Sequence, residues 1–375
     1  MGTADIVFLI TSFATGGAEH QVRDIAVRLA ERGWSVAIVS MIPPRLEVQQ
    51  NEQRTFPITH LGMQPGSVDV RAIPRLARVL DHLRPRLVHS HMIHANLMAR
   101  LARPISQMPS LVCTSHNVNE EGRLRDLSIR VTDRLADRTT HVSRAGFRSY
   151  LSSRWVSPER AMWLPNGVDL NRFRPMNEMM ETRKTLGIPT GHFVWLAVGL
   201  FRPQKAFDRL VRAFARLEED AVLMIAGDGQ MRAETEIAAE HLGVRDRTLF
   251  LGERSDIPAL MNAADAFVLS SDWEGLPMVL LEAASCALPI VTPDVGGCSD
   301  VVEHSVNGML VEAQDDDALL AAMHRMIQLP VHTREAMGRA GRRSVEERFD
   351  IERIVGQWEQ LYRQLISQEF HRVPG

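Results

Sequence analysis

Short apolar runs alternate with longer amphipathic segments along the first half of the chain. The run IVFLI (6–10) predicts a buried strand, and GGAEHQVRDIAVRLAERG (16–33) predicts a helix that Gly33 could cap. Further strands are expected at residues 35–41, 87–91, 111–116 and 140–143. This alternation predicts a parallel sheet covered by helices.

The pattern stops at WLPNGVDLNRFRP (163–175), whose Pro and Asn-Gly residues indicate a linker. It then restarts, with strands expected at residues 193–199, 221–227, 248–252, 266–271 and 289–293. A chain of 375 residues also exceeds what one hydrophobic core usually supports. We therefore expect domains at 1–168 and 169–355, and a final helix at about 356–375 that could pack back on the first domain.

Composition is that of an ordinary soluble globular protein, with 45% hydrophobic and 24% charged residues. No apolar run is long enough to predict a transmembrane helix, and the N-terminal IVFLI is too short for a signal peptide. The three cysteines, Cys113, Cys286 and Cys298, lack metal-type spacing. These features favour a cytoplasmic protein.

Charge is distributed unevenly, because residues 1–175 carry +8 and residues 176–375 carry −11. A basic half predicts an anionic partner such as phosphates or a lipid surface, although chance distribution is the plain alternative. The Arg-rich segment at 120–138 could lie on an anionic membrane or meet a lipid diphosphate. It could equally be a surface helix packed by its apolar residues (Leu124, Leu127, Val131 and Leu135).

Two acidic residues stand eight apart in SSDWEGLPMVLLEA (270–283). Glu274 lies in the turn after an expected strand, and Glu282 lies in the helix that follows. Two carboxylates there can each accept two hydroxyl hydrogen bonds, which is how vicinal diols are held. The alternative is a capping acid and a solvated helical glutamate, but the apolar neighbours of Glu282 make a plain exposed face less suitable.

Two glycine-containing turns connect a strand to a helix. GLFRPQKAFD (199–208) carries Arg202 and Lys205, which could face a diphosphate or be merely exposed. TSFATGGAEHQ (11–21) offers the amides of Gly16 and Gly17 to a ligand, or is a plain tight turn. Neither turn has the GxGxxG or P-loop pattern, so nicotinamide and ATP binding are not supported and no cofactor is expected.

Histidines gather after two expected strands, in HSHMIHAN (His89, His91, His94) and TSHNVNE (His116). His-x-His could bind zinc, but no third and fourth ligand set accompanies it. DDD (315–317) is better explained as helix-capping acids, and no Asp-x-Asp stands at a strand end. We therefore expect no metal, and the histidines could also be hydrogen-bonded structural residues.

The chain carries the motifs GGAE, HSHMIHAN, TSHN, PNGVD, VGLFRPQKAFD, AGDGQ, EGLPMVLLE and VGG, in this order. Together they closely resemble the pattern of the family 4 retaining glycosyltransferases. The resemblance implies an α/β chain of the GT-B fold, with two Rossmann-like domains whose parallel sheets face across a cleft. It implies that Glu282 holds the nucleotide ribose, while Glu274 and His116 contact the transferred sugar. The implied catalytic residues are Lys205, Arg202, Glu274 and His116; those binding the donor are Gly16, Gly17, Gly227, Asp228, Gly275, Leu276 and Glu282; acceptor-side candidates are His91, His94 and Asn117.

One position departs from the family pattern: Leu200 stands where an arginine usually follows the glycine, and Arg202 could supply that cation. The resemblance implies metal-independent transfer of a hexose or N-acetylhexosamine, with retention, from a UDP- or GDP-linked donor bound by the C-terminal domain. The acceptor, on the N-terminal domain, would be a glycan or lipid diphosphate in bacterial cell-surface polysaccharide assembly, at the inner face of the cytoplasmic membrane. A nucleic-acid partner is not expected. Alternatives are a sugar-nucleotide epimerase, a phosphorylase, or a non-catalytic binding subunit.

Overall fold

The chain divides into two units, one formed by Met1–Gly167 with Ile351–Gly375, the other by Val168–Asp350. The computed structural model describes residues 3–13, 16–44, 56–67, 69–118, 123–177, 179–217 and 220–370. We call the two parts the N-terminal unit and the C-terminal unit. Their boundary falls one residue before the expected position 168, and the chain returns to the N-terminal unit five residues before the expected position 356.

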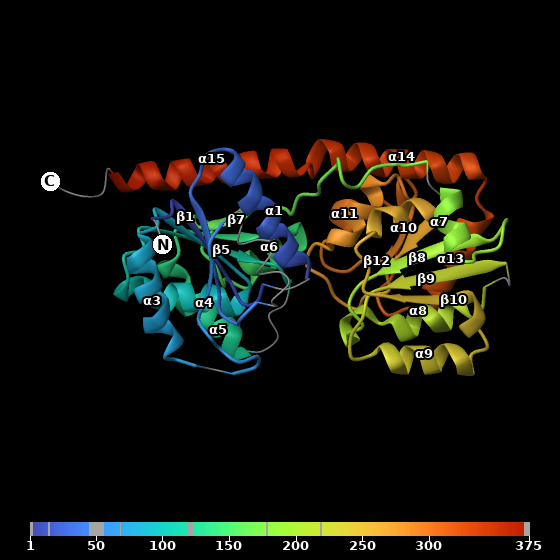
Figure 1. Cartoon of the computed structure of the whole chain (residues 1–375), viewed down its shortest axis with the longest axis horizontal. Helices are drawn as coiled ribbons and strands as arrows, with labels where there is room; N and C mark the ends of the chain where they lie inside the picture. The colour runs from blue at the N-terminus through green and yellow to red at the C-terminus, as the bar shows by residue number, and fades with distance from the viewer. Residues whose placement is uncertain are drawn as a thin grey trace. The chain divides into compact units, whose positions relative to one another are not determined.

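The N-terminal unit is built on a parallel sheet (Figure 1), which has seven strands in its described part. Their order is β3-β2-β1-β4-β5-β6-β7. The strands are β1 Ile6–Ile10, β2 Val36–Ser40, β3 Ile58–His60, β4 Leu87–His91, β5 Ser110–Ser115, β6 Arg138–His141 and β7 Ala161–Trp163. The helices are α1 Gly17–Glu31, α3 Ala72–Leu83, α4 Ile93–Ala102, α5 Arg123–Thr132, α6 Arg144–Ser152 and α15 Ile351–Phe370, with 3-10 turns η1 Arg103–Ile105 and η2 Asp133–Leu135.

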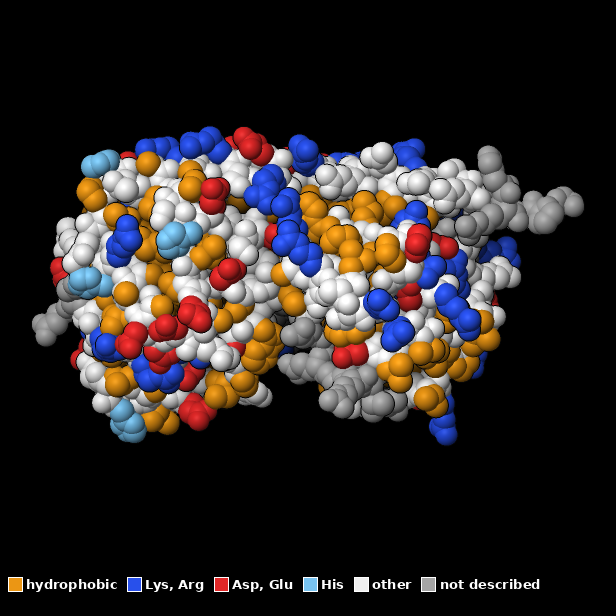
Figure 2. Space-filling view, turned by 180° about the vertical axis from the view of Figure 1, so that it is seen from behind, with side chains coloured by type: hydrophobic (Ala, Val, Ile, Leu, Met, Phe, Trp, Pro, Cys, Tyr) orange, Lys and Arg blue, Asp and Glu red, His pale blue; other side chains and the backbone are white. Residues whose placement is uncertain are grey.

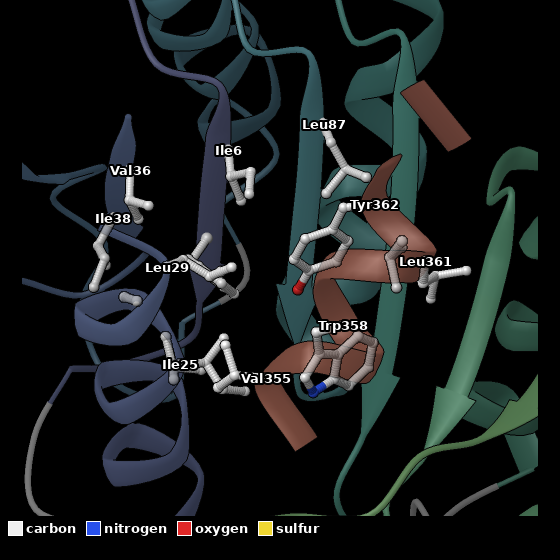
Figure 3. Packing of buried hydrophobic residues seen from close by; sticks show 14 of the residues in the cluster. Ile6, Ile25, Leu29, Val36, Ile38, Leu87, Val355, Trp358, Leu361 and Tyr362 are labelled. Carbon is white, nitrogen blue, oxygen red and sulfur yellow. The ribbon is translucent and has the colours of Figure 1, made fainter. Parts of the chain in front are cut away.

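Both faces of this sheet are buried, which explains why its central strands are apolar without alternation. Ile6, Phe8 and Ile10 of β1 pack in one cluster with α1 and α15. Val7 and Leu9 pack on the opposite face with α3 and α4. Figure 3 shows Trp358 and Tyr362 of α15 reaching the sheet beside β1 and β4. The end of the chain therefore completes the core that its beginning starts.

The C-terminal unit repeats this plan around a parallel sheet of order β10-β9-β8-β11-β12-β13. Its strands are β8 Phe193–Val198, β9 Ala221–Ala226, β10 Thr248–Gly252, β11 Ala266–Val268, β12 Ile290–Pro293 and β13 Gly308–Val311. Its helices are α7 Met179–Thr185, α8 Phe207–Phe214, α9 Arg232–His241, α10 Ile257–Ala263, α11 Met278–Ser285, α12 Cys298–Val301, α13 Asp316–Gln328 and α14 Val331–Arg348, with 3-10 turns η3 Pro203–Lys205 and η4 Arg245–Arg247. Asp315 caps α13 by accepting a hydrogen bond from the amide of Ala318, so DDD does begin a helix.

Sequence patterning missed three short strands, β3, β7 and β13. Each has three or four residues, which is too short to display a period, and β3, β7 and β13 all lie at sheet edges. The expected strand at 266–271 is also shorter, because β11 ends at Val268. Residues 269–271 continue instead as a buried, irregular segment toward Glu274.

Helix α5 does not pack through Leu127 and Val131, as the packed alternative for this segment required. Among its described side chains Ile129 is buried, and it joins a small cluster with Ile93, Tyr150 and Val156. Leu127 and Val131 are instead 55% and 62% exposed. Within the described ranges, no helix has the length and apolarity needed to cross a membrane.

Candidate active site

The centre of the C-terminal sheet is a topological switch point. Strand β8 pairs with β9 on one side and with β11 on the other, so the connections leave β8 and β11 in opposite directions. In parallel α/β sheets, ligands bind beyond the carboxyl ends of the strands at such a point. The residues that follow β8 and β11 here are 199–206 and 269–277, the two motifs that the sequence singled out.

An ion pair joins these two segments. Lys205 Nζ donates a hydrogen bond of 2.6 Å to Glu274 Oε1, and the two side chains are only 16% and 7% exposed. The lysine stem runs over Gly199, where an added Cβ would lie 3.2 Å from Lys205 Cε. Gln204 donates to the carbonyl of Trp273 at 2.8 Å and to Glu274 Oε2 at 3.4 Å. The site thus has a fixed cation, held by a buried carboxylate.

Hydrogen bonds to backbone carbonyls fix this pair in place. Ser270 Oγ donates to the carbonyl of Lys205 at 2.7 Å, and the amide of Asp272 donates to the carbonyl of Gln204 at 2.9 Å. Arg209 of α8 binds the carboxylate of Asp272. Because each segment is tied to the other at several points, the ammonium and the carboxylate are preorganised. The sequence analysis did not identify Gln204 or Arg209, although Gln204 stands inside the quoted motif.

Arg202 lies on the same turn and differs from Lys205 in its surroundings. It is exposed, and its guanidinium has no hydrogen bond or ion pair to any described residue. Leu200, at the position where the family pattern has arginine, is half-buried. Arg202 can therefore swing toward an anion at this turn, and its role stays a prediction.

The turn at Gly227 and Asp228 supports the loop that follows β8. Gly227 has φ +137°, and an added Cβ would lie 1.9 Å from the carbonyl oxygen of Gly199, so only glycine fits. The carbonyl of Asp228 accepts from the amide of Phe201 at 2.9 Å, while its side chain accepts from the amide of Gly229 at 2.7 Å. These residues act on the site by shaping the 199–201 backbone.

The turn that carries Glu274 rests on a second glycine loop. Gly296 has φ +56°, and an added Cβ would lie 2.0 Å from the carbonyl oxygen of Glu274. The carbonyl of Gly275 accepts from the amide of Gly297 at 2.6 Å, and Leu276 is 5% exposed. Gly275 and Leu276 are thus buried in the turn, with their backbone at the site. Gly296 was missed as a site residue, although VGG was part of the sequence pattern.

Glu282 lies in α11 on a half-buried face, between the fully buried Leu281 and Ala283. Burial, and then the charge of Glu282, raise the pKa of the Cys286 thiol to about 12. Because Glu282 is half-buried, its carboxylate is only partly desolvated, which avoids the full cost of a buried charge. That exposure leaves it able to accept hydrogen bonds from a ligand.

The N-terminal unit has its own switch point, at β1 and β4. Gly16 precedes α1 and Gly17 begins it, at the carboxyl end of β1. Glu19 folds over this turn, since an added Cβ on Gly16 would lie 2.3 Å from Glu19 Oε2, and Glu19 Oε1 accepts from Ser12 Oγ at 2.9 Å. Glu19 is only 9% exposed and was missed as a site residue, although it ends the GGAE motif.

Two of the predicted histidines lie side by side at the ends of β4 and β5. His91 Nδ1 and His116 Nε2 are 3.0 Å apart. His91 is 1% exposed, so it cannot itself present a surface to an acceptor, whereas His116 is half-buried. His94 is exposed on the first turn of α4. His89 is buried and bonded on both ring nitrogens, to Tyr362 and Thr114, which makes it structural.

Asn117 is exposed, and its carbonyl accepts a hydrogen bond from His141 Nε2 at 2.8 Å. His141 was not singled out by its sequence context, THVS. The amide of Ser143 donates to His141 Nδ1 at 3.0 Å, so Nε2 carries the proton. His141 therefore fixes the backbone that follows β5 next to His116.

All the buried histidines of the N-terminal unit are held neutral. Burial, with neighbouring imidazoles, lowers the pKa of His89 and His91 well below its usual range. Burial and then His141 lower the pKa of His116 to about 3. Burial lowers the pKa of His141 to about 4, against two hydrogen bonds that raise it. Partial desolvation and then Arg125 lower the pKa of His94.

No group of three or more His, Cys, Asp or Glu side chains is arranged to hold a metal ion in the part of the chain that the structure describes. His89 and His91 are occupied by the contacts given above. The prediction of a metal-free site stays a prediction.

Two Rossmann-like units, each with a parallel sheet and polar residues at its switch point, make up the GT-B fold. Residues 178–344 match the family described as "Glycosyl transferases group 1", and residues 15–172 match "Glycosyltransferase Family 4". The chain belongs to this glycosyltransferase family, as its motifs indicated.

Several characterised relatives have similar sequences. The chain is 28% identical over 313 residues to "UDP-Gal:alpha-D-GlcNAc-diphosphoundecaprenol alpha-1,3-galactosyltransferase" of Escherichia coli, covering 80% of each chain. It is 26% identical over 374 residues to "N-acetyl-alpha-D-glucosaminyl L-malate synthase" of Bacillus anthracis, covering 95% of this chain and 96% of that one. The fold is similar to that of Anabaena HepE, solved in complex with UDP, with a TM-score of 0.84, 23% identity, and coverage of 96% and 100%.

Proposed function

We propose that the protein is a retaining glycosyltransferase that moves a hexose or N-acetylhexosamine from a UDP-sugar to a lipid-diphosphate-linked glycan without a metal ion. The observation that carries this proposal is the Lys205–Glu274 ion pair at the switch point of the C-terminal sheet. A buried ammonium at the carboxyl end of a parallel sheet suits a diphosphate. The neighbouring carboxylate suits sugar hydroxyls.

Each group at this switch point has a role in the proposed reaction. Lys205, with Arg202 from the same turn, stabilises negative charge as it develops on the leaving diphosphate. Glu274 Oε1 is bonded to Lys205, while Oε2 has only a long contact with Gln204 and can accept from a sugar hydroxyl. Glu282 holds the ribose hydroxyls. The diphosphate then removes the acceptor proton on the face it leaves, which gives retention.

We propose UDP, and not GDP, as the nucleotide of the donor. The Escherichia coli relative is named for UDP-Gal, and the HepE structures contain UDP or UDP-glucose. The same relative is named for a diphosphoundecaprenol acceptor, which supports a lipid-linked acceptor for this chain. GDP-sugars are the comparison in any binding test.

A lipid-linked acceptor requires access to a membrane, and α5 is the candidate contact. Leu127 and Val131 are exposed one turn apart, which is unusual for a helix that packs through Ile129. Arg125, Arg130 and Arg134 are exposed along the same segment. In Figure 2, blue side chains predominate over red on the N-terminal unit, at the right of that view. We propose that the exposed face of α5, with these arginines, binds the anionic inner face of the cytoplasmic membrane.

The test is a panel of UDP- and GDP-sugars, scored first by thermal shift and then by transfer to a synthetic diphospholipid-linked sugar. One UDP-sugar is expected to raise the melting temperature most, since ligand at 100 times its Kd stabilises by about 2.7 kcal/mol. Product NMR should show the anomeric configuration of the donor. Transfer should survive excess EDTA.

Four results would contradict parts of this proposal. Inverted product would refute retention, and activity lost on chelation and restored by magnesium or manganese would refute metal independence. Donor binding without transfer or hydrolysis above background would favour a non-catalytic binding subunit. Hydrolysis or epimerisation without transfer would favour the epimerase alternative.

A further inference from the structure

We propose that His91 is a positioning residue that fixes the ring and the tautomer of His116, so that His116 presents an uncharged Nδ1–H to an oxygen of the substrate. The identity of that oxygen rests on the proposed function. The pairing of the two imidazoles does not, because it lies wholly within the N-terminal unit.

The buried ring of His91 lies against the half-buried ring of His116. β4 and β5 are neighbouring parallel strands, and their last residues are His91 and Ser115, with His116 next. His91 Nδ1 lies 3.0 Å from His116 Nε2, and the ring centroids are 5.3 Å apart. His91 is 1% exposed, while His116 is half-buried. The other ring nitrogen of His116, Nδ1, has no hydrogen bond to a described residue. It is also not one of the buried polar atoms without a partner, so it is accessible.

The unpaired atom in this cluster decides which nitrogen carries the proton. His91 Nε2 is buried without a hydrogen-bond partner among the described residues. If Nε2 carried the hydrogen, a buried N–H group would have no acceptor. Such groups are rarer than buried acceptors that have no donor. His91 therefore carries its proton on Nδ1 and donates it to His116 Nε2. His116, being neutral, then carries its own proton on Nδ1, the accessible side.

The ring of His91 is itself held by packing. The ring of His89 lies at 4.1 Å and that of Phe8 at 5.8 Å, measured between centroids. His89 is fixed by Tyr362 Oη at 2.5 Å and by Thr114 Oγ1 at 2.6 Å. Figure 3 shows the Tyr362 hydroxyl, which comes from α15. A residue near the end of the chain thus supports the histidine pair.

The backbone after His91 is also restrained. Met92 has φ 74° and ψ 153°, a strained conformation for a residue other than glycine. It is held because its amide donates to the carbonyl of Thr114 at 3.1 Å and its carbonyl accepts from the amide of Asn96 at 2.9 Å. The Asn96 side chain donates to the same Thr114 carbonyl at 2.9 Å. Backbone strain that hydrogen bonds maintain in this way is typical of a functional site.

A neutral donor at this point has a defined chemical use. It can hydrogen-bond a hydroxyl, ring or glycosidic oxygen of a sugar without adding a positive charge to the site. Burial keeps the ring neutral, since the pKa of His116 lies at about 3. His116 is therefore a hydrogen-bond donor and not a general acid or base between pH 5 and 8.

The direct test is nitrogen NMR of the ligand-free protein with ¹⁵N-labelled histidine. The His116 signals are assigned as those lost in His116→Gln. We expect a protonated Nδ1 and an unprotonated Nε2 for His116, unchanged from pH 8 to 5. A protonated Nε2, or a mixture of tautomers, would overturn the inference whether or not transfer is observed.

Variants of His91 provide the second readout. His91→Phe keeps a ring but removes the donor, so His116 should become a mixture of tautomers, and kcat should fall about tenfold with little change in KM for the donor. His91→Asn can place an amide N–H near the lost Nδ1–H and should restore one tautomer and most of kcat. His82→Phe, at an exposed histidine of α3, is the matched control.

The outcomes separate the two proposals. If His91→Phe does not fold, the spectra of the wild type and of Tyr362→Phe still show which nitrogen of His116 is protonated. Tyr362→Phe is the milder change, because it removes one hydrogen bond to His89. Unchanged His116 signals and unchanged kcat in His91→Phe would overturn the inference while leaving glycosyl transfer standing. The expected spectra with no transfer from any UDP- or GDP-sugar would instead overturn the proposed function.

Discussion

The two sheets share the order of their first six strands, but their switch points carry different chemistry. Beside β1 and β4 lie neutral imidazoles, His91 and His116, and a carboxylate bonded to a hydroxyl. Beside β8 and β11 lies the Lys205–Glu274 ion pair, with Arg202 exposed on the same turn. The fold determines where a ligand can bind, while the residues after each strand determine its charge. The N-terminal unit thus suits uncharged hydroxyl groups, and the C-terminal unit suits a diphosphate.

The largest effect is expected from Lys205→Ala, which removes the fixed cation of the C-terminal switch point. Transfer should fall by about 10²–10³-fold, the loss typical of one preorganised charge-stabilising group. Stability of the C-terminal unit should also fall, because Glu274 is left buried without its partner. Steady-state kinetics with the best donor measures the first effect. Lys184→Ala, at the other lysine of the chain and exposed on α7, should change nothing.

Glu282→Ala tests how the C-terminal unit holds the nucleotide. Affinity for UDP and for the donor should fall alike, by about 1.5–3 kcal/mol, the value of hydrogen bonds to a charged group. Glu274→Ala should impair transfer and leave UDP affinity nearly unchanged, since Lys205 remains. Calorimetry measures both, with Glu240→Ala of α9 as the exposed control. Equal UDP binding by Glu282→Ala and wild type would remove the ribose assignment.

Low pH should destabilise the N-terminal unit more than the C-terminal unit. The folded-state pKa values of His116 (about 3) and His141 (about 4) lie below the unfolded value of about 6.5. Below pH 6.5 the unfolded chain therefore binds more protons, so stability is complete above that pH and is lost as pH falls toward 4 and then 3. Each histidine contributes at most about 1.4 kcal/mol per pH unit.

Hydrogen exchange at pH 7 and pH 5 measures this difference. Peptides from β4, β5 and β6 should lose protection at pH 5 before those from β8 and β9. His89→Gln should flatten the pH dependence in the N-terminal unit, because it removes one group that titrates on unfolding. Equal loss of protection in both units would show that the buried histidines do not govern acid stability.

The last prediction concerns the surface of α5. Anionic vesicles should bind the protein more tightly than neutral ones, by about 1 kcal/mol for each basic residue near the surface at low salt. Reversing Arg125, Arg130 and Arg134 to glutamate should abolish the preference, and so should high salt. Reversing three exposed arginines of the C-terminal unit, Arg216, Arg339 and Arg343, is the charge-matched control. Equal co-sedimentation with both vesicle types would point to a soluble acceptor.

Sequence patterning predicted the fold well because parallel strands buried on both faces are continuous apolar runs. β1, β4, β8, β9 and β12 lie within one residue of their expected positions at either end. It failed for β3, β7 and β13, where edge strands of three or four residues show no period. It also left the packing of α5 open, because an amphipathic pattern does not say which face meets the core.

Motif spacing likewise located Lys205, Glu274 and the glycine turns, since these follow strands directly and the carboxyl ends of parallel strands share one edge. Spacing did not indicate that Lys205 and Glu274, 69 residues apart, form an ion pair. Nor did it identify His141 or Tyr362, whose sequence neighbourhoods carry no motif. Their importance arises from contacts with residues far along the chain.

The sequence by itself determined the class of fold, the two-part organisation and the residue types at each switch point, because these follow from local periodicity and from turns next to strands. Only the tertiary structure decided which of those residues are neutral, which are paired and which are exposed. Burial and hydrogen-bond partners set charge states, and both depend on what packs against a residue from elsewhere in the chain. His91 and His94 illustrate the difference. They lie three residues apart in one motif, yet one is buried behind His116 and the other is exposed on α4.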